Sequence, residues 1–197
     1  MKQHFYIPLC SIFLFLSAYA QETETKFGIC STISSPPNIG VRLYFPQLFD
    51  LRFSYSFLSN SIERDISTSQ GTQSLETKRM EHEITLGAAA YLAARTLSEN
   101  TITRFYIGIN FSYNNQGQTE PVLQVPSLDY ISKTAEADLY GTSIFAGNEL
   151  LLFDVVSVFG EAGIQYSTGK IPSAVLANPS TTTTSLSGNI GMIYYFN

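Results

Sequence analysis

Cysteine and charge are both scarce in this 197-residue sequence, and each shortage excludes a class of protein. There are two cysteines, and Cys10 lies in an N-terminal segment that we expect to be removed, which leaves Cys30 alone. A single thiol cannot form an internal disulfide, so the chain is not a disulfide-stabilised secreted module. Lys and Arg number 11 against 16 Asp and Glu, and the basic residues are not clustered. This balance argues against a nucleic-acid partner, which would need clustered basic residues.

Long apolar runs are absent after residue 20, which excludes a transmembrane helix there. The one apolar run, from Phe5 to Leu16, follows Lys2 and precedes the triplet Ala18-Tyr19-Ala20. A positive start, a short apolar stretch and small residues at Ala18 and Ala20 predict a secretory signal peptide at residues 1–20. A membrane anchor is the alternative, but the run is shorter than the span of about 20 residues that an anchor needs. The mature domain is then residues 21–197.

Aromatic residues, in contrast, are abundant, with 12 Tyr and 14 Phe. The clearest pattern that they form is an alternation of apolar and polar residues in the segment 101–114. Because the apolar positions recur at every second residue, this segment cannot be an amphipathic helix. It predicts a β-strand of about the length that crosses a bilayer when tilted. Its apolar face consists of Phe105, Ile107, Ile109, Phe111 and Tyr113.

The same period of two recurs in seven other segments, which gives eight predicted strands. The segment 79–94 includes an alanine-rich stretch that favours a helix by propensity, but its alternation of apolar and polar residues indicates a strand. The eight predicted strands are 26–35, 38–46, 49–60, 79–94, 101–114, 138–152, 155–167 and 184–196.

The connections between these segments alternate in length. The first hairpin, near Pro36 and Pro37, is short and is the exception to this alternation. Short turns at one rim and long loops at the other are typical of outer-membrane β-barrels, whose short turns face the periplasm. The other short connections are 46–48, 95–100 and 153–154, and the predicted long polar loops are 61–78, 115–137 and 168–183.

The two faces of the strands differ in a way that indicates which one meets lipid. One face is large and apolar, with aromatic residues near its ends, which predicts girdles at two membrane interfaces. The other carries Gly, Ser, Asn and Thr with a few opposed charges, and such residues can fill the narrow interior of an eight-stranded barrel. The charged fraction of 14% is also below the value of about 25% for soluble domains. The predicted interior charge network is Arg42, Asp50, Arg52, Glu83, Arg104, Glu149 and Glu161.

The C-terminal segment Gly188 to Phe196, together with the eight alternating segments, resembles the small outer-membrane β-barrel proteins of the OmpA and OmpX membrane-domain type. Phe159 to Tyr166 is similar to the penultimate strand of such barrels. The resemblance implies an all-β, eight-stranded antiparallel up-and-down transmembrane barrel in the outer membrane of a Gram-negative cell, with membrane lipid as its surroundings. It also implies recognition by the barrel assembly machinery. The residues of that assembly signal are Ile190, Met192, Tyr194 and Phe196, and Asn197 after the final aromatic departs from the pattern.

The leading functional hypothesis is a non-enzymatic, monomeric envelope protein without a cofactor, which contacts an unidentified surface ligand or forms a weak pore. A soluble periplasmic or secreted β-barrel that binds an apolar ligand is the first alternative. A lipid-modifying barrel enzyme that uses His82 is the second. His82 has no serine at the spacing of barrel deacylases and no second histidine to complete a metal site, so it is interpreted as a solvated rim residue. Glu149 and Glu161 could form a glycosidase-like pair, but ion pairs with the interior arginines are the preferred interpretation.

Overall fold

The structure is a computed structural model that describes residues 25–33, 37–45, 48–68, 71–124, 129–173 and 178–196. The predicted signal peptide, including Ala18 and Ala20, and the last residue, Asn197, lie outside this part of the chain. No helix among the described residues is long and apolar enough to cross a membrane. The regular elements of the described residues are eight strands: β1 Lys26–Thr32, β2 Asn38–Phe45, β3 Phe49–Thr68, β4 Gly71–Ser98, β5 Thr101–Gln124, β6 Asp129–Leu152, β7 Val156–Lys170 and β8 Ser180–Phe196.

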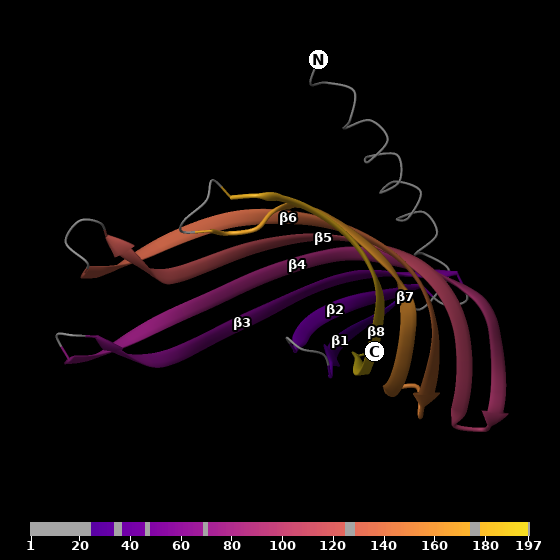
Figure 1. Ribbon diagram of the computed structural model, residues 1–197. Coiled ribbons are helices and arrows are strands. Elements are labelled where there is room, and N and C mark those ends of the chain that lie inside the picture. The colour runs from indigo at the N-terminus through magenta and orange to yellow at the C-terminus, as the bar shows by residue number, and fades with distance from the viewer. Residues whose placement is uncertain are drawn as a thin grey trace, which may run out of the picture.

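The strands form one closed antiparallel barrel (Figure 1). Each strand pairs with the next one along the chain, and β8 pairs with β1 to close the ring, with Phe27 opposite Phe196. Closure gives every strand of the ring a hydrogen-bonding partner on both sides, so that no edge is left open there. The predicted all-β barrel of eight antiparallel strands is confirmed.

The long polar connections are a correction to the sequence analysis, because most of their length is strand. β3 continues to Thr68 and β4 begins at Gly71, and β5 and β6 likewise extend through most of 115–137. These hairpins project far beyond β1 and β2, as Figure 1 shows on its left side. Cross-strand side-chain pairs support them, for example Thr119 and Thr134, whose hydroxyl oxygens are 2.9 Å apart. Beyond the apolar band the outward side chains become small or polar, as at Asn115, Gly117 and Thr119, so the period-two signal is lost although the strands continue.

The wall of the ring has an apolar outer face, and its inner face combines charged and polar side chains with buried hydrophobic ones such as Phe145, Leu151 and Ile193. Along β5 the outward side chains from Phe105 to Tyr113 are all exposed, whereas inward Tyr106 is completely buried. Exposed Tyr and Phe side chains lie near both ends of this outer band. Phe45 lies on the same face of β2 as exposed Leu43 but is buried, and its ring stacks on that of Phe49 with 4.5 Å between the centroids. The exposed aromatic residues near these ends include Tyr55, Phe57, Tyr113, Tyr140 and Tyr166 at the end near the long hairpins, and Phe27, Tyr194 and Phe196 at the opposite end.

Candidate functional site: a charged floor below a polar vestibule

Six of the seven residues of the predicted interior network lie deep inside the barrel, where they form a layer that we call the floor. Each occupies an inward position of its strand, because side chains alternate between the two faces of a sheet. All six are nearly or completely inaccessible to solvent. The floor residues are Arg42, Asp50, Arg52, Arg104, Glu149 and Glu161.

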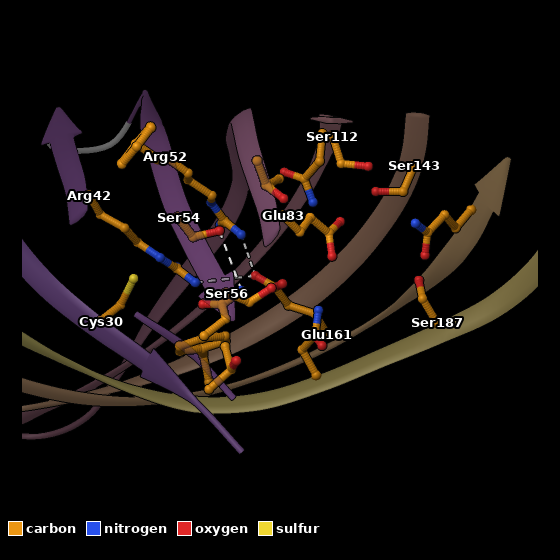
Figure 2. A pocket seen from close by; sticks show the side chains of 18 residues that line it. Cys30, Arg42, Arg52, Ser54, Ser56, Glu83, Ser112, Ser143, Glu161 and Ser187 are labelled. Atoms are coloured by element: carbon orange, nitrogen blue, oxygen red, sulfur yellow. Dashed lines mark hydrogen bonds and ion pairs between the residues drawn. The ribbon is translucent and has the colours of Figure 1, made fainter. Parts of the chain in front are cut away.

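Arg42 and Arg52 are joined through two carboxylates. Arg52 donates to both oxygens of Asp50, from Nε at 2.6 Å and from Nη2 at 3.0 Å, and to Oε1 of Glu161. Arg42 reaches the same Glu161 oxygen from Nη2 at 3.4 Å, and its Nη1 lies 3.6 Å from Asp50. Tyr106 donates a further hydrogen bond of 2.8 Å to Glu161. Figure 2 shows both guanidinium groups pointing toward this carboxylate.

A second group of floor residues surrounds Glu149. The hydroxyl of Tyr195 donates to Oε1 of Glu149 at 2.9 Å, and Nη1 of Arg104 lies 3.9 Å from the same oxygen. The hydroxyl of Tyr91 is 3.1 Å from Glu149 and 3.0 Å from Asp50, so it links the two groups. A hydroxyl has one proton and donates to one of these carboxylates at a time.

The buried charges of the floor balance, with three arginines against three carboxylates. This balance matters because a buried charge without a partner is strongly destabilising. The guanidinium groups also lie over aromatic rings, at 4.1 Å for Arg42 over Phe159 and 4.3 Å for Arg104 over Tyr44. Planar, weakly hydrated guanidinium groups suit such stacking better than ammonium groups do. Ion pairs and rings together fill this cross-section of the barrel.

The tyrosines of the floor were missed as functional residues by the sequence analysis. Tyr106 and Tyr195 occupy alternate positions on the same strand face as the polar residues, and this was the signal that could have identified them. The register of the β4–β5 pair shifts between Tyr91 and Ala93. The sequence pattern alone does not locate this β-bulge.

Above the floor, on the side of the long hairpins, lies a polar cavity of about 250 Å³ that we call the vestibule. Cys30, Arg42, Arg52, Phe159 and Glu161 line its lower part. Nearly all of its other lining side chains are hydroxyls and amides, which hydrate readily. These polar side chains are Thr32, Asn38, Ser54, Ser56, Thr85, Asn110, Ser112, Ser143, Gln165, Ser187 and Asn189.

Glu83 was predicted to join the interior charge network, but it lies apart from the arginines. It lies in the vestibule wall, where its carboxylate hydrogen-bonds Ser112 and the neighbouring charge is that of Glu81. Among the described residues no arginine forms an ion pair with it. The two residues lie at different depths in the barrel. Arg52 on β3 is opposite Gly87 on β4, and Gly87 is two inward positions deeper along β4 than Glu83.

His82 and the C-terminal residues lie on the outer surface of the barrel. The Nδ1 atom of His82 is 2.8 Å from the hydroxyl oxygen of Tyr55, and its ring is 4.9 Å from that of Phe57. Within the described segments, no group of three or more His, Cys, Asp and Glu side chains could hold a metal ion. The residues expected to form the assembly signal are exposed in β8: Ile190, Met192, Tyr194 and Phe196.

Comparisons with known proteins give similarity at the level of the fold. No protein-family model matches the chain, and no curated protein sequence matches it either. Among solved structures, the chain is similar to a major outer membrane protein from Thermus thermophilus, with 13% identity, a TM-score of 0.49, and coverage of 87% of this chain and 99% of that one. It is also similar to the N-terminal β-barrel domain of Pseudomonas aeruginosa OprF, with 12% identity, a TM-score of 0.39, and coverage of 87% and 96%. Neisserial surface protein A is a further similar structure, with 15% identity, a TM-score of 0.43, and coverage of 87% and 94%.

Proposed function

We propose that this chain is an outer-membrane β-barrel protein whose interior is closed by the charged floor. The observation that carries the proposal is the distribution of polarity in the barrel wall. Large apolar side chains such as Ile107, Phe111 and Ile164 are exposed on the outside, while arginines and carboxylates are buried inside. This arrangement suits a barrel surrounded by hydrocarbon, where ionisable groups face the interior and pair with one another.

The height of the apolar band supports a membrane location. On β5 the outward apolar residues run from Phe105 to Tyr113, a stretch of nine residues. Nine strand residues at a tilt of about 40° rise roughly 23 Å, close to the apolar band of about 25 Å in outer-membrane barrels. Beyond Tyr113 the next outward residues on this strand are Asn115 and Gly117, as expected where a wall leaves the hydrocarbon.

The alternative of a soluble barrel with an apolar ligand is less well supported. It requires an apolar interior and a charged exterior, and the vestibule and floor have the opposite character. The alternative of a lipid-modifying enzyme rests on His82, whose Nδ1 faces the Tyr55 hydroxyl rather than a serine or a carboxylate. We therefore propose a non-enzymatic envelope role.

The floor and the long hairpins narrow this role further. Because ion pairs and aromatic rings fill the barrel below the vestibule, we propose that the protein does not admit solutes through the membrane. The hairpins β3–β4 and β5–β6 would project from the cell, with charged and hydroxyl side chains exposed along them. This geometry favours contact with a surface partner over transport.

Reconstitution of residues 21–197 into liposomes tests this proposal. We expect the folded protein to float with the vesicles, to resist extraction with alkaline carbonate, and to leave the vesicles as impermeable to sucrose as empty ones. Recovery of the protein in the aqueous phase without detergent would refute the membrane location. Sucrose-dependent swelling of the vesicles would refute the closed floor and favour a pore.

A further inference from the structure

The vestibule contains one charge that no described arginine or lysine neutralises. In the floor each carboxylate has an arginine partner: Asp50 and Glu161 are paired with Arg52, and Glu149 lies near Arg104. Glu83 is additional to these pairs and lies higher in the wall. The charge that acts on it is that of another carboxylate, Glu81, which is itself ion-paired with Arg79. Because the charges of the floor balance, the floor and the vestibule together carry one excess negative charge, at Glu83.

The surroundings of Glu83 are oxygen atoms that can accept hydrogen bonds. Ser112 contacts it directly, and Ser56, Thr85 and Asn110 line the same cavity. Figure 2 shows Glu83 and Ser112 on one side of the cavity, and Arg42 and Arg52 directed toward Glu161. The two arginines thus pair with a different carboxylate, and Glu83 is available to bind a positively charged ligand.

From this arrangement we propose that the vestibule binds a small polar solute that carries a primary ammonium group, with Glu83 as its anionic partner. An ammonium group has three donors and no acceptor, which matches a carboxylate flanked by hydroxyl and amide oxygens. A charge-assisted hydrogen bond of this kind is about twice as strong as a neutral one. The cavity volume of about 250 Å³ sets a limit on the size of the solute.

Two other classes of cation fit the cavity less well. A quaternary ammonium group prefers the open faces of aromatic rings, but Phe159 in this cavity is covered by Arg42 at 4.1 Å. A divalent metal ion needs several carboxylate or carbonyl ligands, and Glu83 is the only carboxylate of the described lining residues that is not paired with arginine. A primary ammonium group requires only one carboxylate.

Nuclear magnetic resonance of the full mature chain in detergent micelles tests the proposal with ethanolamine as the probe. We expect saturable shifts of the backbone amide signals of Thr85 and Ser112. We expect Glu83→Gln to weaken the apparent affinity about tenfold or more, because the charge-assisted bond is lost. Ser112→Lys, which places an ammonium group beside Glu83 and leaves that carboxylate in place, should also abolish the shifts.

Two controls make the result decisive. Glu76→Gln alters an exposed carboxylate of the β4 extension and should leave binding unchanged. Ethylene glycol, the neutral analogue of the probe, should give no saturable shifts. Three results would each overturn the proposal. The first is the same ethanolamine titration for the wild type and Glu83→Gln, and the second is equal shifts with ethylene glycol. The third is a Glu83-dependent response to calcium chloride but not to ethanolamine. Because the titration uses micelles, it reports on the vestibule whether or not the protein resides in the outer membrane.

Discussion

Replacement of Glu161 by alanine is expected to lower the free energy of unfolding by about 3–5 kcal/mol, the cost of removing one partner from a buried ion pair. The carboxylate of Glu161 accepts hydrogen bonds from Arg42, Arg52 and Tyr106 at one oxygen atom. Its loss leaves two buried guanidinium groups with Asp50 as their remaining anionic partner. The measurement is an unfolding titration with urea in lipid vesicles. The folded fraction at each urea concentration is read from the electrophoretic mobility of unheated samples, and the midpoints of the variants are compared.

The matched control is Glu76→Ala, which removes an ion-paired carboxylate from the exposed part of β4. Glu76 accepts a hydrogen bond from Ser61 at 2.6 Å and lies 2.9 Å from the ammonium group of Lys78. These two contacts hold the pKa of the Glu76 carboxyl below its usual value. We expect no measurable change in the urea midpoint, because exposed pairs contribute little. A similar loss of stability for both variants would contradict a special role for the floor.

The second large effect is expected for Ile109→Arg. Ile109 is an exposed side chain at the centre of the outward apolar face of β5, with Ile107 and Phe111 as its neighbours on that face. An arginine near the middle of the hydrocarbon layer destabilises a barrel by about 2–4 kcal/mol. The variant should therefore fold into vesicles with a correspondingly lower urea midpoint, or fail to insert.

The control for this substitution is Gly117→Arg, on the same strand and the same outward face but beyond the apolar band. A Cβ atom added at Gly117 would meet nothing within 4 Å, so the start of the new side chain has open space. The proposed membrane location predicts a near-normal midpoint for this variant, since its arginine lies in water. If Ile109→Arg were tolerated as well as Gly117→Arg, the outer face of β5 would not be in contact with lipid.

Alternation of residue types was sufficient to predict the ring of the barrel but not its extensions. Within the ring, one face of each strand meets an apolar surrounding and the other a polar interior, so the sequence alternates. Past Tyr113 the outward face of β5 is no longer apolar, and polar residues such as Asn114 and Asn115 follow one another without such an alternation. The polar sequence was therefore predicted to be a loop, although the strand continues to Gln124.

The residues of the floor could also be predicted only in part from the sequence pattern. Alternation places Arg52 and Glu83 on inward positions, but it does not give their relative depth inside the barrel. Depth depends on the register of each strand pair, in which Arg52 is opposite Gly87 and Glu83 is opposite Ser56. The β-bulge beside Tyr91 adds a further local change that depends on the three-dimensional pairing. The sequence thus predicts which residues face inward, and the register decides which of them meet.

The most direct test of the membrane location is fractionation of cells that express the full chain, followed by electrophoresis of heated and unheated samples. We expect the protein in the outer-membrane fraction, and we expect its band to shift on heating as the closed barrel unfolds. Recovery in the soluble fraction, with the same mobility before and after heating, would contradict the membrane location. That result would instead favour a soluble barrel.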